Sequence, residues 1–351
     1  MTRHPEIYMN NFKRSPQVKT TNNNFLPSNK ALLSCLMIGV AAPVTAQADS
    51  IDDIINNFTA QASVYSDSGG IRIEDRSVQY TRTYKENKNK TDWKLEAHDY
   101  DIKGETGSDT YHGPDIVGTI TKEFNDYVTG ELSVGAVYLE NQRTRDYTRR
   151  NKYNAKVTIK PNKKVTINVA HGEDLLFKEA IIEDDNNKLV SGQTSKITGS
   201  WRAADRIIIE GGSQYRRLSD GNKSRHHRGA VLYGISTGTP WVWAGVEAQS
   251  LSYEESKSNY WSPRDYEAYS LLITGSHKIT EKISIDGNAN INRTKENDSN
   301  WATGGAVTIG ANYALTENTS IRADASYLES TRDNVKWDGS KVGLSFVVSN
   351  F

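Results

Sequence analysis

Apolar and polar residues alternate with a period of two along most of the chain after about residue 57. The alternation is clearest in Ile283–Asn292, where every second residue is apolar or small and the residues between them are serine, aspartate or asparagine. Val128–Tyr138, Tyr153–Ile159 and Ile321–Tyr327 repeat the pattern. Successive side chains of a β-strand point to opposite faces, so the pattern predicts strands with one apolar and one polar face. We find no comparable helical period.

The overall composition excludes several other classes of protein. Hydrophobic residues make up 36% of the 351 residues, and the mean hydropathy is −0.67. A membrane helix needs about 20 mostly apolar residues, so the chain carries no bundle of such helices. The 43 basic and 43 acidic residues balance each other. A nucleic-acid-binding surface is usually basic, so we expect no nucleic-acid partner.

Residues 1–48 have the organisation of a signal peptide. A basic lead ends at Lys30, Ala31–Val44 is apolar, and Ala46-Gln47-Ala48 has the small-x-small pattern that signal peptidase cleaves. We expect cleavage before Asp49 and export of the mature chain; a buried N-terminal helix is the alternative. Cleavage leaves 38 basic and 42 acidic residues and removes Cys35, the only cysteine. The mature chain then has no disulfide, no thiol nucleophile and no cysteine ligand for a metal.

Connections of alternating length separate the predicted strands. Short ones lie at 87–90, 125–126, 161–163, 203–205, 237–240, 280–281 and 316–318, and longer polar ones at 104–110, 141–145, 178–189, 218–224, 253–263, 293–300 and 331–336. Short turns at one rim and long loops at the other are typical of outer-membrane barrels. We therefore expect residues 49–57 to form a short periplasmic segment and residues 58–351 to form a barrel.

Sixteen strands account for this part of the chain, although fourteen remains possible. They are 58–66, 71–85, 91–102, 111–123, 127–140, 147–160, 164–177, 190–201, 206–217, 225–236, 241–252, 264–279, 282–292, 301–315, 319–328 and 337–351. The predicted fold is an all-β, transmembrane, antiparallel up-and-down barrel in the lipid of the outer membrane.

Aromatic residues near strand ends support this fold. Membrane barrels carry aromatic girdles at both interfaces, and six tryptophans lie beside predicted connections: Trp201, Trp241, Trp243, Trp261, Trp301 and Trp337. The C-terminal Phe351 resembles the terminal aromatic that barrel-assembly machinery reads, which implies that machinery as a partner. Because the apolar phase runs through Val342, Leu344, Phe346 and Val348, a bulge is expected before Phe351.

The polar face of such a barrel lines a lumen, and its residues are the functional candidates. The predicted pore-lining residues are Glu131, Lys156, Asn168, Glu210, Glu247, Gln249, Asp286, Asn288, Asn290, Arg322 and Asp324. Five acids against two bases suggest a weakly acidic track for a neutral or partly cationic polymer. In the alternative interpretation these side chains only hydrate the lumen and pair with one another.

One short motif carries a family resemblance. Tyr260-Trp261-Ser262-Pro263 followed by Tyr266 resembles the Tyr-aromatic-Ser-Pro-x-x-Tyr/Phe stretch in the C-terminal barrels of exopolysaccharide exporters, those for cellulose and poly-N-acetylglucosamine. The resemblance implies export of a growing polysaccharide through the lumen. In those exporters a periplasmic array of helical repeats precedes the barrel. No 34-residue repeat occurs here, so a scaffold would be a separate chain. Alternatively, the motif is a loop edge that feeds aromatics into the outer girdle.

Two other functions are compatible with the sequence. A general or sugar-selective diffusion porin would need a long loop folded into the pore, and Lys178–Leu189 could be that loop, although we favour a solvated external loop. A structural or adhesive barrel is another possibility. Catalysis is not expected. Of the histidines His98, His112, His171, His226, His227 and His277, only His226 and His227 cluster, beside Arg225 and Arg228. Adjacent strand residues point to opposite faces, so that pair cannot chelate a metal together, and no cofactor fingerprint occurs.

Overall fold

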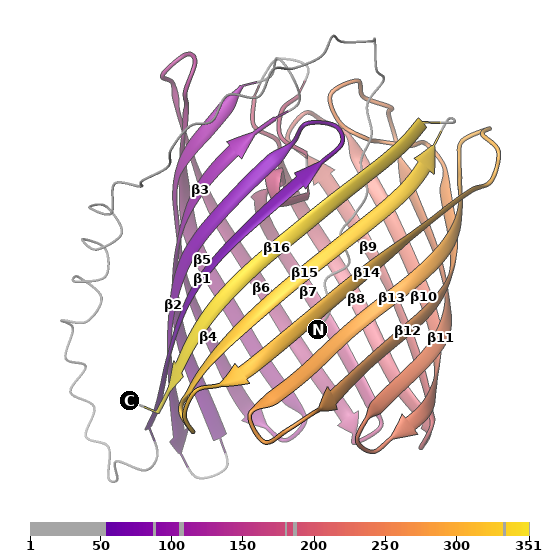
Figure 1. Cartoon of the computed structure of the whole chain (residues 1–351). Coiled ribbons are helices and arrows are strands. Elements are labelled where there is room, and N and C mark those ends of the chain that lie inside the picture. The colour runs from indigo at the N-terminus through magenta and orange to yellow at the C-terminus, as the bar shows by residue number, and fades with distance from the viewer. Residues whose placement is uncertain are drawn as a thin grey trace.

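The computed structural model describes residues 54–350 except 87–88, 105–108, 180, 185–187 and 333–334. Sixteen strands form a closed barrel (Figure 1). Their bounds are β1 Ile54–Asp67, β2 Arg72–Glu86, β3 Asn89–Lys103, β4 Thr110–Asn125, β5 Val128–Asn141, β6 Tyr147–Asn162, β7 Val165–Leu175, β8 Ser191–Ala204, β9 Ile207–Leu218, β10 Lys223–Thr237, β11 Trp241–Tyr253, β12 Tyr266–Lys278, β13 Ile283–Glu296, β14 Ala302–Ala314, β15 Thr319–Arg332 and β16 Val335–Ser349. A single 3₁₀-helical turn, η2, spans Phe177–Glu179 within this part of the chain.

Each strand pairs antiparallel with its sequence neighbours, and β1 pairs with β16 to close the barrel. The closing register runs from Asn57 opposite Ser349 to Asp67 opposite Gly339. Closure leaves no strand edge with unpaired backbone groups, which is what a β-structure needs in lipid, where no water can satisfy them. The prediction of a sixteen-stranded antiparallel up-and-down barrel is confirmed.

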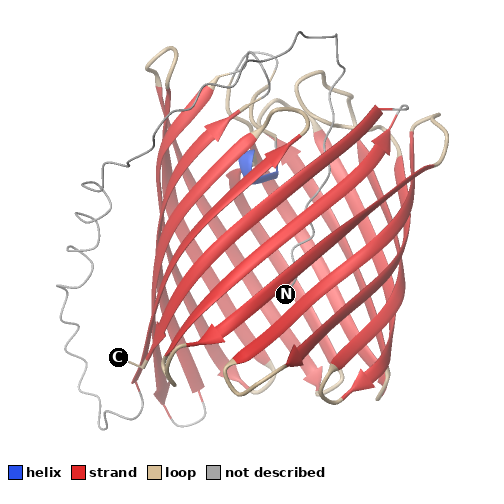
Figure 2. Cartoon of the chain, viewed as in Figure 1, coloured by secondary structure: helices blue, strands red, loops and turns tan. Residues whose placement is uncertain are grey.

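Short turns and longer loops lie at opposite ends of the barrel (Figure 2). Side-chain caps explain two of the tight turns. Asn125 Oδ1 accepts hydrogen bonds from the backbone N–H groups of Tyr127 and Val128, both at 2.9 Å. Asn162 Oδ1 does the same for Lys164 and Val165, at 2.8 and 3.0 Å. These asparagines form Asx-turns, which satisfy backbone donors locally and reverse the chain in a few residues.

The apolar set of alternating residues faces outward. Val342 is 63% exposed, Leu271 62% and Ile309 58%, values that only a lipid-facing surface explains for such side chains. The opposite set faces the interior of the barrel. The sequence pattern therefore assigned the two faces of these strands correctly.

The tryptophan prediction is right for two residues and wrong for four. Trp201 and Trp301 are 49% and 40% exposed, as girdle residues should be. Trp241 is 38% exposed, but it shares the inward phase of β11 with Trp243, and their ring centroids are 6.1 Å apart. The side chains of Trp243, Trp261 and Trp337 are 3–5% exposed and buried in the barrel interior. Proximity to a strand end does not decide the face, because a shift of one residue moves a side chain to the opposite side.

The ends of the barrel differ slightly from the prediction. β1 begins at Ile54 rather than at Phe58, so part of the expected periplasmic segment belongs to the barrel. β16 keeps its register without a bulge as far as Ser349, and Asn350 follows with a left-handed φ of 56°. Phe351 and the predicted signal peptide lie outside the described residues. Among the helical residues described, none form a segment able to cross a membrane.

Candidate channel lumen

The eleven predicted pore-lining residues all lie on the inner face of the wall. They alternate with the exposed apolar residues along each strand. Glu131 of β5 lies opposite Lys156 of β6, and Asn168 is on β7, the next strand. Asp286 and Asp324 lie on either side of Gly310. The eleven residues are Glu131, Lys156, Asn168, Glu210, Glu247, Gln249, Asp286, Asn288, Asn290, Arg322 and Asp324.

Arg322 binds two carboxylates on this face. Its guanidinium donates two hydrogen bonds to Asp286, Nη1 to Oδ1 at 2.6 Å and Nη2 to Oδ2 at 3.0 Å. Nε donates a third to Asp324 at 3.2 Å. The side chain crosses β14 at Gly310, where an added Cβ would lie 2.1 Å from Arg322 Nη2. The glycine thus leaves the space in which a bidentate pair can form.

Arg228 forms a second group of the same kind. Its Nε donates to the Glu247 carboxylate, and its Nη2 lies 3.8 Å from Glu210 Oε2. Next to it, His226 Nε2 and Gln249 Oε1 are 3.2 Å apart. β10 starts at Lys223, and the side chains of both Arg228 and His226 point inward.

Polar contacts of moderate strength connect the predicted residues on β5–β8. Lys156 Nζ lies 3.7 Å from Glu131 Oε2. Thr158 Oγ1 donates to Asn168 Oδ1 at 2.8 Å, and Asn168 Nδ2 donates to Thr198 Oγ1 at 3.3 Å. Closer to the long loops, Lys152 binds Asp115. These contacts join the polar side chains of neighbouring strands along this part of the wall.

The inner face carries charges of both signs. Besides the predicted residues, the register places further bases there (Lys94, Lys152, Lys196, Arg216, Arg228 and Lys341) and further acids (Asp75, Glu96, Asp115 and Asp174). With these residues included, acids and bases on the inner face are nearly balanced, and the excess of acids is smaller than among the predicted residues alone. Pairing, rather than an acidic track, is the dominant electrostatic feature of this wall.

A neutral row crosses the wall between β12 and β15. Thr274 lies opposite Asn288, Asn288 opposite Thr308, and Thr308 opposite Ser326. The next row toward the long loops holds Asn290 and small or apolar residues. We call Thr274, Asn288, Thr308 and Ser326 the polar row. Its groups donate and accept hydrogen bonds and carry no charge.

The loop after β7 folds into the barrel, and η2 lies inside the barrel outline near its long-loop end in Figure 2. Phe177 is 2% exposed and packs edge-on against Tyr100 of β3, with ring centroids 4.9 Å apart. Lys178 Nζ lies 4.9 Å from the Tyr100 centroid. Arg216 of β9 donates to both carboxylate oxygens of Glu179, at 2.6 and 2.9 Å.

Four apolar residues further along this loop are also buried. Ile181, Ile182, Leu189 and Val190 are at most 6% exposed and belong to one cluster with inward side chains of β2–β5 and β9. Tyr111 of β4 donates a hydrogen bond to Glu183. We call the described residues of 176–190 the inward loop. The expectation of a solvated external loop is wrong: its apolar residues, interspersed with acids, were the signal that could have revealed the docking.

The family-like motif is also buried rather than in the girdle. Tyr260, Trp261, Ser262, Pro263 and Tyr266 all have buried side chains. Tyr260 OH donates to Asp220 Oδ2 at 2.7 Å and accepts from Asn222 Nδ2 at 3.0 Å.

Further contacts within the motif hold the 254–265 loop in place. Ser262 Oγ accepts from the Lys257 N–H at 2.7 Å, and Trp261 packs edge-on against Tyr266 at 5.1 Å. The motif therefore holds the 254–265 loop against the 219–222 turn at the mouth of the barrel. The interpretation as a girdle edge is wrong.

Metal binding receives no support from the side-chain positions. In the part of the chain that the structure describes, no three His, Asp or Glu side chains are grouped so as to hold a metal ion.

Comparisons with known proteins agree with this architecture. No protein-family model matches the chain, and no curated protein sequence does. A solved structure described as a bacterial polysaccharide outer membrane secretin has a TM-score of 0.67 and 11% identity, over 86% of this chain and 100% of that chain. OccK3 (OpdO) of Pseudomonas aeruginosa gives a TM-score of 0.47 and 8% identity, over 86% of this chain and 97% of its own.

A third solved structure, the outer membrane protein OpdK of Pseudomonas aeruginosa, gives a TM-score of 0.45 and 7% identity, over 86% and 100% of the two chains. Identities this low establish the fold and nothing finer. The closed sixteen-stranded barrel, its exposed apolar band and the match to the first of these structures place this chain in the outer membrane as a porin-type β-barrel.

Proposed function

We propose that this protein is an outer-membrane channel that exports a neutral polysaccharide through its lumen. The observation that carries the proposal is the polar row, in which four strands in succession present Thr274, Asn288, Thr308 and Ser326 to the interior. Hydroxyl and amide groups exchange hydrogen bonds with sugar hydroxyls and acetamides without a charge that would hold the polymer too tightly.

The charges nearest the polar row are partly compensated. Arg322 pairs with both Asp286 and Asp324, so one positive charge offsets one of the two negative charges in the row next to it toward the short turns. A lumen with uncompensated carboxylates would attract cations. The pairing instead favours an uncharged polymer over the partly cationic one that the sequence also suggested.

Two resemblances support export in particular. The structure with a TM-score of 0.67 is described as a polysaccharide outer membrane secretin. The buried motif at Tyr260–Tyr266 resembles that of exopolysaccharide exporters. By the same resemblance we propose a periplasmic scaffold on a separate chain, and barrel-assembly machinery that reads the C-terminus.

A second candidate is a sugar-selective diffusion porin, and the inward loop favours it. A docked loop that narrows the pore suits small solutes. An exporter instead requires this loop to move aside when polymer arrives. The loop's many buried apolar contacts make that displacement costly, so the two candidates differ in how often the loop opens.

Planar-bilayer recording of the mature protein tests the proposal. For an exporter we expect a small basal current, with rare large openings, that neutral oligosaccharides block more strongly as their length grows. Asn288→Ala together with Asn290→Ala should weaken the block about thirtyfold, since two lost hydrogen bonds remove about 2 kcal/mol and 1.4 kcal/mol is a factor of ten. Ala289→Ser, on the outer face of the same strand, should leave the block unchanged.

Other outcomes separate the alternatives. A steady current blocked equally by mono- and oligosaccharides identifies a diffusion porin. No current, even after removal of residues 181–188 from the inward loop, identifies a structural barrel without transport.

A further inference from the structure

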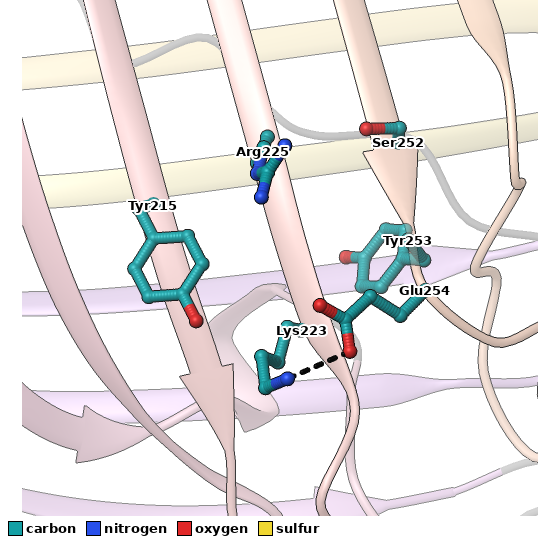
Figure 3. A pocket seen from close by; sticks show the side chains of 6 residues that line it. All are labelled: Tyr215, Lys223, Arg225, Ser252, Tyr253 and Glu254. Atoms are coloured by element: carbon teal, nitrogen blue, oxygen red, sulfur yellow. Dashed lines mark hydrogen bonds and ion pairs between the residues drawn. The ribbon is translucent and has the colours of Figure 1, made fainter.

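A cationic patch lies on the outer wall of β9–β11, at the long-loop end. Arg217 is opposite Lys223. In the adjacent row Tyr215, Arg225 and Ser252 lie side by side. A cavity of about 240 Å³ lies between these side chains (Figure 3). It is lined by Tyr215, Lys223, Arg225, Ser252, Tyr253 and Glu254. One row further toward the lipid band lie Ser213, His227 and Ser250.

The patch lies where the apolar band ends. The outward positions of β10 run from Ile235 through Tyr233, Val231 and Gly229 to His227 and Arg225. Strands tilted by about 40° with a rise of about 3.3 Å per residue cross an apolar band about 25 Å tall in about ten residues. Counted from Ile235, which is 55% exposed, the band ends at Arg225. The patch is therefore level with the headgroups of the outer leaflet.

The charges of the patch are mostly uncompensated. Lys223 Nζ pairs with Glu254 at 2.8 Å. Among the residues that the structure describes, no acid lies within ion-pair distance of Arg217 or Arg225, both exposed. The outer wall of β2–β3 differs, because there Arg76 pairs with Glu74, Asp99 and Asp101 and Arg72 pairs with Glu74.

We propose that this patch, Arg217, Lys223 and Arg225 with the serine and tyrosine hydroxyls around them, binds the phosphate group of a phosphorylated glycolipid in the outer leaflet. Guanidinium groups suit phosphate because they donate paired hydrogen bonds. Tyr215, Ser252 and Ser213 supply hydroxyls that suit the sugar of the same headgroup. Basic groups at the membrane surface each attract an anionic lipid measurably. The ligand lies outside the barrel, so this site is independent of what the lumen transports.

The test is native mass spectrometry of the detergent-purified mature chain with lipid A carrying two phosphates. We expect the wild type to retain this lipid, and Arg217→Gln with Arg225→Gln to retain at least tenfold less. Arg72→Gln with Arg76→Gln is the matched control and should retain as much as the wild type. Dephosphorylated lipid A should bind the wild type as weakly as the patch variant binds the phosphorylated form.

Three results would overturn the proposal. Equal loss in the control variant would show unspecific attraction to basic residues. Undiminished binding of dephosphorylated lipid A would show that the acyl chains alone are recognised. Complete competition by inorganic phosphate at concentrations comparable to the lipid would assign the patch to free phosphate. Heat-modifiable migration on a gel confirms that each variant is a folded barrel before the comparison is made.

Discussion

Arg216 and Glu179 form a bidentate ion pair that ties the inward loop to the inner face of β9. The two N–O distances are 2.6 and 2.9 Å, and the Arg216 side chain is 6% exposed. Removing one partner of such a buried pair leaves the other charge without compensation.

Arg216→Gln should therefore release the inward loop. A charge-assisted hydrogen bond contributes about 1.5–3 kcal/mol, so the population of open channels should rise about tenfold or more. Single-channel recording measures this as the fraction of time in the large-conductance state. Arg217→Gln changes the next residue, which faces outward, and serves as the control. An unchanged open fraction in Arg216→Gln would mean that the loop does not gate the lumen.

Glu183 should make loop docking depend on pH. Burial raises the pKa of Glu183, against the smaller opposing effect of the hydrogen bond from Tyr111. A raised pKa means that the docked loop prefers the protonated carboxyl, so docking is strengthened as the pH falls through this pKa and weakened above it. We expect the open fraction to fall on acidification. Glu183→Gln should remove this pH dependence and stay near the acidic value. A conductance that increases at low pH in the wild type would contradict the role of Glu183.

Gly310 should control the pairing of Arg322 with the carboxylates of the lumen. A Cβ at this position would lie 2.1 Å from Arg322 Nη2, so Gly310→Ala must displace the guanidinium from Asp286. Uncompensated carboxylates concentrate cations, and we expect the cation-to-anion permeability ratio, measured from reversal potentials in a salt gradient, to rise severalfold. Gly343→Ala is the control, because its Cβ would meet neighbours only at ordinary distances of 3.5 and 3.7 Å. Equal ratios for the two variants would show that the displaced arginine still compensates the carboxylates.

Tyr260 should hold the 254–265 loop at the mouth. Tyr260→Phe removes the hydroxyl that donates to Asp220 Oδ2 and accepts from Asn222 Nδ2, so Asp220 Oδ2 loses this donor and Asn222 Nδ2 keeps its bond to the Glu255 carbonyl. The loss costs about 1–3 kcal/mol, so proteolytic cleavage after Lys257 should accelerate about tenfold. Tyr147→Phe, at a tyrosine that is 76% exposed, is the matched control. Cleavage at the wild-type rate would show that the Tyr260 hydroxyl does not hold the loop and that the motif acts only through the packing of its rings.

Local patterns predicted much of the wall. The alternation in Ile283–Asn292 assigned Asn288 and Asn290 to the interior and Ile291 to the lipid, because the period of two is a property of the strand itself. The same reasoning placed Arg322 and Asp286 on one face. It did not reveal that they meet, since that contact crosses β14 at Gly310 and depends on the register of three strands.

The sequence by itself determined the class of this protein, because covering lipid on one face and water on the other imposes alternation on every strand. The spacing of the turns predicted sixteen strands and left fourteen as the alternative. Only the tertiary structure decided where the inward loop lies. Phe177 contacts Tyr100 and Glu179 contacts Arg216, and these partners come together only when the barrel closes. The acids of the inward loop predicted a solvated loop. The closed barrel provides Arg216, Tyr111 and an apolar surface, and these partners allow the loop to be buried.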